Sequence, residues 1–335
     1  MFIRICFVFL LCSFLPSFSF SEDLSTKIPR WKQLSHTYGF ILGQDFTLNR
    51  IEQEYPDLSR EIQEAKRQFS ISALGEGAKG LEPELSLLLG EKWKSFKVEL
   101  LEEIQKRLAE QVITKESAIN FLKEVEKRSR GELNNDILST ILSTNKRYQD
   151  NPGQELVEGW KQTYRTKGHP KSKGSDISVS FPLSWSKREG DRPNVIQFFQ
   201  SGAGYGPIMV TLMVKDLGLP VGTILSKNDL KEFFTPNEMK DMVPEGSTFV
   251  EAKSITLENL PAGMLVCDKD MERLDFKAKI RMTQFQIICK NQMYILGFML
   301  TKQQDSADSL DTLQSKYLPT FRVIANTLVI NDNYE

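Results

Sequence analysis

The sequence predicts an α+β protein: an N-terminal all-α helical domain followed by an α-β-α sandwich with a mainly antiparallel sheet. Three observations lead to this fold class. Between residues 22 and 164, apolar side chains recur every three or four residues, the period of amphipathic helices. From residue 176 the period changes to two, as in half-buried strands. A stripe of helical spacing over residues 310–328 then closes the chain, and we expect it to cover one face of the sheet.

The length and composition are those of an ordinary globular protein with two domains. The chain has 335 residues, of which 40% are hydrophobic and 26% are charged. The formal net charge is −1, and no basic stripe is evident. The sequence therefore predicts no nucleic-acid partner.

Residues 1–21 have the order of a secretory signal peptide. Arg4 precedes an apolar run over residues 5–15, and Ser19 and Ser21 are small residues that suit a cleavage site. The apolar run is shorter than the ~20 residues that a membrane helix needs, so a signal peptide is favoured over an uncleaved anchor. We therefore expect an exported protein, periplasmic or secreted after cleavage near Ser21, and not an integral membrane protein.

Residues 22–164 form the predicted helical domain. Thr47 is predicted to cap a helix over residues 48–54, and the glycine-rich segment 74–80 is predicted to be flexible. Short loops between amphipathic helices favour a small bundle in which the apolar stripes pack on one another. The alternative is a groove that binds extended clients, lined by Leu85, Leu88, Trp93 and Phe96.

Residues 165–175 (RTKGHPKSKGS) are predicted to be a linker, because the segment is basic, rich in Gly, Pro and Ser, and without an apolar residue to bury. A basic segment also suits an anionic membrane surface, so peripheral membrane association stays open.

The predicted sandwich domain, residues 176–335, begins with a strand in which Ile177, Val179 and Phe181 alternate with serines. Pro182 ends that strand, and Trp185 is expected to fold over the end of the core. The glycine cluster at residues 201–206 lacks the spacing of a phosphate-binding loop and leads into a strand, so a hairpin loop is favoured. Residues 248–300 indicate an antiparallel meander.

The segment SFPLSW at residues 180–185, with the DRPN turn and the IQFF strand that follow, resembles the Mog1/PsbP-like superfamily. The resemblance covers about residues 176–328, and the helical half lies outside it. It implies an α-β-α sandwich used as a binding or assembly module, often exported and often beside membrane complexes. It implies no catalytic residue.

The residue types that usually carry catalysis are poorly placed, and no cofactor is predicted. His36 lies among the early helices and His169 lies in the predicted linker, so neither suits a rigid catalytic site. Cys267 and Cys289 lie in apolar strands. In the predicted hairpin Cys267 lies opposite about residue 282, some 20 Å from Cys289 at ~3.3 Å per residue, so two buried thiols are favoured over a disulfide.

Carboxylates offer the remaining chemistry. Asp268, Asp270 and Glu272 share one face of a predicted strand and, with Asp275, have ligands for a hard cation. An exposed strand face has the same pattern, so the sequence predicts no metal site.

The predicted binding surface is the bend that carries an aromatic ring and both signs of charge: Trp185, Lys187, Arg188, Asp191 and Arg192. The competing interpretation is that Trp185 covers the core and that the charges are merely solvated.

The predicted function is an exported, non-enzymatic binding or assembly module that acts through a protein partner in the cell envelope. The residues favour a non-enzymatic role without deciding it. The first alternative is a periplasmic chaperone-like protein whose helical half binds clients. A weaker alternative is a small-ligand-binding protein or a hydrolase.

Overall fold

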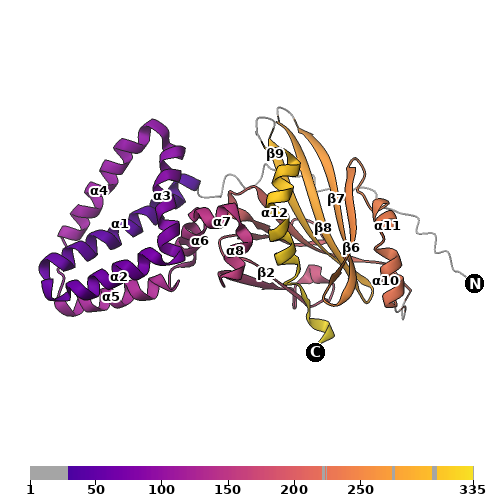
Figure 1. Cartoon of the computed structure of the whole chain (residues 1–335), viewed down its shortest axis with the longest axis horizontal. Helices are drawn as coiled ribbons and strands as arrows, with labels where there is room; N and C mark the ends of the chain where they lie inside the picture. Colours follow the sequence, from indigo (N-terminus) through magenta and orange to yellow (C-terminus); the bar gives the residue numbers. More distant parts are fainter. Residues whose placement is uncertain (1–28, 221–222, 224, 274–275, 304–307, 335) are drawn as a thin grey trace, which may run out of the picture.

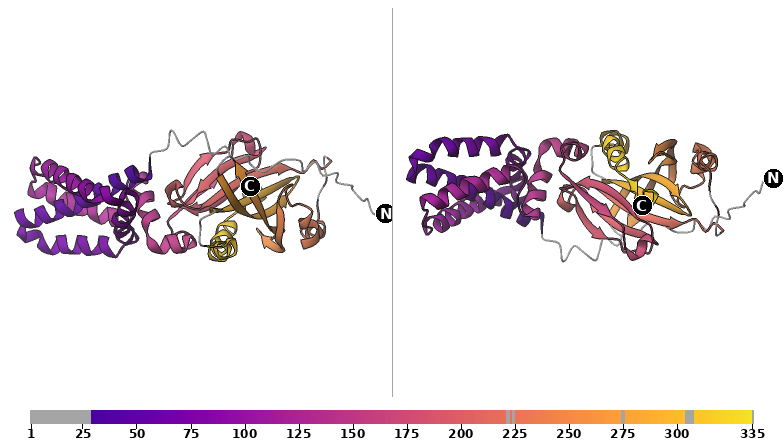
Figure 2. Two further views of the ribbon diagram at one scale, coloured as in Figure 1. Left: turned by 90° about the horizontal axis from the view of Figure 1, so that it is seen from above. Right: turned by 90° about the horizontal axis from the view of Figure 1, so that it is seen from below.

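The computed structural model describes residues 29–334 except 221–222, 224, 274–275 and 304–307. The predicted signal peptide lies outside the described residues. The molecule is elongated, with a helical part at one end and a sheet part at the other (Figures 1 and 2). Among the residues that the structure describes, no helix combines the length and the apolar character needed to cross a membrane.

The N-terminal part is helical, as predicted. Its helices are α1 (Arg30–Glu54), α2 (Ser59–Ile71), α3 (Ala73–Leu89), α4 (Trp93–Ala109), α5 (Lys115–Ser129), α6 (Asn135–Thr144), α7 (Lys146–Asp150) and α8 (Pro152–Val157). One hydrophobic core joins α1 to α7, and Leu34, Ile51, Ile62, Leu81 and Ile141 are fully buried in it.

The C-terminal part contains two sheets. The larger has the order β3 (Ser186–Glu189), β4 (Val195–Gln200), β5 (Ile208–Asp216), β9 (Gln292–Gln303), β8 (Phe276–Cys289), β7 (Leu260–Arg273) and β6 (Thr248–Leu257), with every neighbouring pair antiparallel. The smaller contains β1 (Lys161–Arg165), β2 (Ile177–Pro182) and β10 (Val329–Ile330). The helices of this part are α9 (Ser201–Gly204), α10 (Lys227–Phe233), α11 (Pro236–Lys240) and α12 (Leu310–Ala325).

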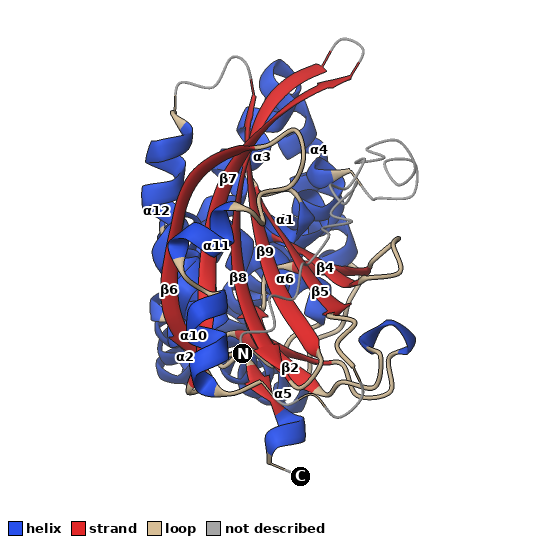
Figure 3. Ribbon diagram, turned by 90° about the vertical axis from the view of Figure 1, so that its right-hand side faces the viewer, coloured by secondary structure: helices blue, strands red, loops and turns tan. Residues whose placement is uncertain are grey.

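Helices cover both faces of the large sheet (Figures 1 and 3). On one face, Phe321 of α12 stacks on Phe298 of β9, with ring centroids 4.4 Å apart. On the other face, Phe234 and Met239 from the α10–α11 region pack against Ile288 of β8. The alternation along the strands separates these two cores, as period two requires. The predicted α+β class with an α-β-α sandwich is therefore confirmed.

The predicted helix start at Thr47 is wrong, because α1 continues without a break from Arg30 to Glu54. The Thr47 hydroxyl donates to the Gly43 carbonyl at 2.7 Å, as threonines do inside helices. Leu48 and Ile51 extend the buried stripe of α1. Burial of that continuous stripe outweighs a local capping preference.

The predicted flexible segment 74–80 is instead the first half of α3. A Cβ at Gly77 would lie 2.2 Å from the Ile141 carbonyl oxygen, and one at Gly80 would lie 2.1 Å from the Thr144 carbonyl oxygen. The Thr144 hydroxyl donates to the Gly77 carbonyl at 2.8 Å. The glycines therefore permit close contact between α3 and α6, and tertiary packing offsets their low helix propensity.

The predicted linker does not separate the two parts. Arg165 ends β1, which pairs with β2, and residues 166–175 connect these strands. Thr166 is buried, and its backbone N–H donates to the Ile177 carbonyl at 2.9 Å. Helix α8 already contacts β2 and α12. The segment lacks apolar residues, but hydrogen bonds order it, so the chain enters the sheet part earlier than predicted.

The cysteines lie where the predicted hairpin puts them. Cys267 of β7 pairs with Met282 of β8, and Cys289 follows seven residues farther along β8. Both are free and buried. Burial raises the pKa of the Cys267 thiol to about 12, so this thiol is a poor nucleophile at neutral pH.

Candidate functional site

A cavity of about 350 Å³ lies between the helical part and the sheet part. We call it the interdomain cleft. Its buried lining includes the apolar and aromatic side chains of Leu142 in α6, Trp185, Ile208 in β5 and Tyr317 in α12. Three buried serines, Ser143, Ser184 and Ser201, also line it. Its remaining lining carries charges on both parts of the chain: Arg30, Glu84, Lys146, Asp150 and Lys316. A volume near the lower end of the ~300–1,000 Å³ usual for ligand pockets suits a small group and not a folded surface.

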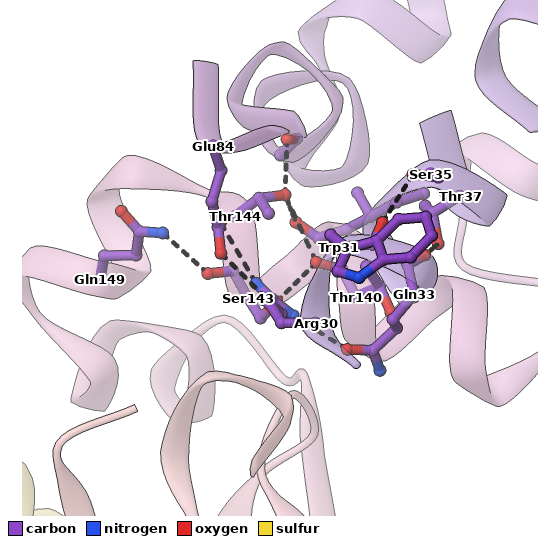
Figure 4. A network of polar contacts seen from close by, with 12 residues as sticks. Arg30, Trp31, Gln33, Ser35, Thr37, Glu84, Thr140, Ser143, Thr144 and Gln149 are labelled. Carbon is purple, nitrogen blue, oxygen red and sulfur yellow. Dashed lines mark hydrogen bonds and ion pairs between the residues drawn. The ribbon is translucent and has the colours of Figure 1, made fainter. Parts of the chain in front are cut away.

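Arg30 fixes one wall of the interdomain cleft (Figure 4). It is the first residue of α1, and its Nε and Nη2 donate to the two carboxylate oxygens of Glu84 in α3 at 2.8 and 3.2 Å. Nη2 also donates to the hydroxyl of Ser143 in α6 at 3.0 Å, and Nη1 donates to the Gln33 amide oxygen at 3.1 Å. A guanidinium with this many partners positions three helices and has little capacity left for a ligand.

The β4–β5 connection forms the opposite wall. Its residues Gly202, Ala203 and Gly204 all have positive φ, at 60°, 53° and 92°. For Ala203 this conformation is strained, and it places the Ala203 N–H 2.8 Å from the Ser184 carbonyl oxygen, to which it donates. The segment contacts α6. Tyr205 lies with its ring centroid 5.5 Å from the Arg30 guanidinium carbon, so the loop bridges both parts. Strand β4 pairs with β5 antiparallel, which confirms the predicted hairpin.

A buried carboxylate, that of Glu155, forms hydrogen bonds with a residue that lines the interdomain cleft. Glu155 of α8 is 1% exposed and accepts hydrogen bonds from the Ser184 backbone N–H at 2.6 Å and from the Ser184 hydroxyl at 2.7 Å. Burial raises the pKa of Glu155 to about 7, although the bonds from Ser184 act in the opposite direction. Ser184 itself lines the interdomain cleft.

Two lysines share one aspartate at the exposed lining. Lys146 Nζ of α7 lies 3.0 Å from Asp150 Oδ1, and Lys316 Nζ of α12 lies 3.6 Å from the same oxygen. The hydrogen bond from Lys146, helped by the charges of both lysines, holds the pKa of Asp150 below its ordinary value. The lysines come from different parts of the molecule, so their spacing depends on how these parts pack.

The five residues of the predicted binding surface do not form one site. Trp185 is 3% exposed, packs near Phe181 and lines the interdomain cleft. Lys187 is exposed on the edge strand β3, opposite Phe199. Arg188 pairs with Phe198, whose ring centroid lies 4.2 Å from its guanidinium carbon, and forms an ion pair with Asp191 at 3.1 Å. Arg192 is half-buried in the following turn.

Because neighbouring positions of a strand project to opposite faces, Lys187 and Arg188 of β3 point away from each other. Of the five residues, Trp185 is the one that reaches the cleft.

The groove that would favour a chaperone is not formed by its four expected residues. Leu85 is fully buried and Trp93 is 8% exposed, both inside the helical core. Phe96 packs against that core, whereas Leu88 is 49% exposed. The residues therefore fill a bundle and do not line a shared channel.

Two of the four carboxylates that were considered as cation ligands, Asp268 and Asp275, can be assigned. Asp268 is buried and accepts from Arg281, while Asp275 is outside the described part of the chain. Within the described ranges, no group of three His, Cys, Asp or Glu side chains is arranged to hold a metal ion. His36 is exposed, and His169 Nδ1 accepts from the Lys171 backbone N–H at 3.2 Å.

Sequence reasoning missed the charged lining of the interdomain cleft. Arg30 and Glu84 lie in helices, and in the sequence they look the same as charged residues on a solvent-exposed helix face. Lys146 and Asp150 have the common i, i+4 spacing of surface ion pairs. Only the glycine cluster at residues 201–206 pointed to this region, because glycines indicate a loop whose backbone has positive φ angles.

No family model and no curated protein matches this chain. Among solved structures, the chain is similar to LpqN of Mycobacterium tuberculosis, which is described as involved in cell envelope biogenesis. The identity is 13% and the TM-score 0.31, over 52% of this chain and 93% of that chain.

It is also similar to the Ran-binding protein Mog1p of Saccharomyces cerevisiae, with 6% identity and a TM-score of 0.32 over 52% of this chain and 97% of that one. A protein of unknown function from Pseudomonas aeruginosa matches with 12% identity and a TM-score of 0.23, over 51% and 97% of the two chains. These structures match about half of this chain. The fold described above rests on the strand register of this chain and not on these likenesses.

Proposed function

We propose that this protein is an exported, non-enzymatic binding module of the cell envelope, which takes a segment of a protein partner into the interdomain cleft. The observation that carries the proposal is the cleft itself, about 350 Å³ in volume and lined by both parts of the chain. Its buried lining offers an apolar site, and its exposed lining offers charges of both signs. This combination suits recognition of a short polypeptide segment.

The proposed export rests on the order of residues 1–21. Cell fractionation and N-terminal sequencing of the native protein test it. We expect the protein in the exported fraction, with an N-terminus just after Ser21. A cytoplasmic protein that retains residues 1–21 would contradict the export part of the proposal.

Partner binding at the cleft is tested by site-specific photo-crosslinking in the native cells. A benzophenone amino acid placed at Gln149, an exposed residue of the cleft lining, is expected to give an adduct of defined mass with a partner protein. The matched control replaces Lys106, an exposed residue of α4 outside the cleft lining. Equal adduct yield at both positions, or adducts at neither, would contradict binding at the cleft.

A further inference from the structure

The charged lining of the interdomain cleft is unbalanced by one positive charge. Among the charged lining residues, Arg30, Lys146 and Lys316 stand against Glu84 and Asp150. Glu84 accepts two hydrogen bonds from Arg30, so these two charges neutralise each other. Asp150 is left to neutralise both lysines, and Lys316 Nζ lies 3.6 Å from it, beyond ordinary hydrogen-bond distance. The mouth of the cleft therefore suits one additional negative group.

The inner lining of the interdomain cleft suits a single apolar group. Leu142, Ile208 and Tyr317 are 6% exposed or less, and Trp185 is 3% exposed. A volume of about 350 Å³ accommodates one large side chain with its own backbone atoms.

We propose that the interdomain cleft binds the C-terminal residue of a partner chain, with an apolar side chain against Trp185 and Ile208 and the terminal carboxylate beside the lysines Lys146 and Lys316. This inference rests on the proposed function and specifies the chemistry of the bound segment. A terminal residue is the simplest polypeptide group that carries an apolar side chain and a carboxylate on the same carbon. Charge-assisted hydrogen bonds from the two lysines would fix its orientation.

The test uses two fluorescent hexapeptides, Gly-Ser-Gly-Ser-Gly-Phe with a free C-terminus and the same peptide with a C-terminal amide. Fluorescence anisotropy with the purified full-length protein measures both dissociation constants. We expect the free acid to bind at least about tenfold more tightly than the amide, because the amide loses a charge-assisted interaction.

The variant Lys146→Gln with Lys316→Gln assigns the preference to the cleft. These side chains are 81% and 40% exposed, so their loss leaves the fold intact. We expect the preference for the acid to fall to within about twofold. The matched control, Lys106→Gln with Lys123→Gln, removes the same charge from exposed positions of α4 and α5 and should keep the preference.

Equal binding of acid and amide, binding of neither, or an undiminished preference in the Lys146/Lys316 variant would each overturn the inference. The crosslinking at Gln149 separates this failure from failure of the proposed function. If the adduct forms while the free-acid peptide does not bind, the partner enters the cleft by another chemistry. If the adduct is also absent, the proposed function fails with the inference.

Discussion

Two buried carboxylates of this protein have contrasting surroundings. Asp268, in β7 of the large sheet, is 8% exposed and accepts hydrogen bonds from Nε and Nη2 of Arg281 at 2.7 and 2.9 Å. Glu155, where the helical and sheet parts meet, is 1% exposed and accepts hydrogen bonds from the neutral groups of Ser184. Asp268 therefore has a cation beside it, whereas Glu155 is hydrogen-bonded to neutral dipoles of Ser184.

The two settings predict different responses of protein stability to mutation and to pH. In the sheet, the bidentate ion pair compensates the buried charge of Asp268, so removal of Arg281 leaves that carboxylate with the full cost of burial. Arg281 has a second partner, because it also forms an ion pair with Asp311. At the junction, the pKa of Glu155 is raised to about 7, so its charge depends on a small change of pH. The junction between the helical and sheet parts is therefore expected to be a pH-sensitive part of the molecule.

The largest effect is expected from breaking the ion pair in the sheet. Arg281→Met leaves the Asp268 carboxylate buried without its cation and should lower the free energy of unfolding by about 3–5 kcal/mol. Urea denaturation of the variant and the wild type measures this difference. Adding Asp268→Leu removes the uncompensated charge and should restore most of the lost stability. A variant Arg281→Met as stable as the wild type would show that the pair has no such role.

The second effect is a pH dependence at the junction. Because the pKa of Glu155 is raised from 4.5 to about 7, the unfolded chain loses this proton at lower pH than the folded chain. The stability contributed by protonated Glu155 is thus fully present below pH 4.5 and is lost as pH rises toward 7. Glu155→Gln removes the titration, so its stability relative to wild type should increase by about 3 kcal/mol between pH 4.5 and pH 8.

Urea denaturation of both proteins at several pH values measures this change. Glu99→Gln, at an exposed position of α4, is the matched control and should show no comparable shift. If the free energy of unfolding changed with pH in the same way for Glu155→Gln and the wild type, the expected pH sensitivity of Glu155 would be contradicted.

The smallest effects are expected from glycine substitutions in the helical part, where α3 and α6 are in close contact. Gly77→Ala places a Cβ 2.2 Å from the Ile141 carbonyl oxygen, which should force α3 from α6 and cost about 1–3 kcal/mol. Gly43→Ala, within α1, meets no atom within 4 Å and should instead stabilise the protein by about 0.5–1 kcal/mol. Thermal unfolding of both variants tests the opposite signs. Stabilisation by Gly77→Ala would show that α3 and α6 are not held in close contact.

Local patterns in the sequence predicted much of the fold. The alternation at Ile177, Val179 and Phe181 predicts β2, and the hairpin spacing predicts that Cys267 lies opposite residue 282. At the start of α11, the Thr235 hydroxyl accepts a hydrogen bond from the Glu238 N–H, a cap formed by residues three apart in the sequence. These features depend on residues close in sequence, so periodicity and capping rules reach them.

The same local reasoning failed where distant residues compete with it. Thr47 resembles a cap, but the buried stripe of α1 passes through it. The glycines of α3 resemble a flexible segment, but α6 packs directly against their backbone. Residues 166–175 resemble a linker, yet hydrogen bonds to a neighbouring strand order them. In each case tertiary contacts outweigh a local propensity of about 1 kcal/mol.

The two periods of the apolar residues are enough to predict the helical half, the antiparallel sheet and the buried position of both thiols. The interdomain cleft, by contrast, depends on how distant elements pack together. Lys146 and Lys316 are far apart in the sequence, and they meet at Asp150 because α8 packs on α12 and because the β4–β5 loop contacts α6. Such a site depends on the packing of whole elements, whereas periodicity reports only which face of one element is buried.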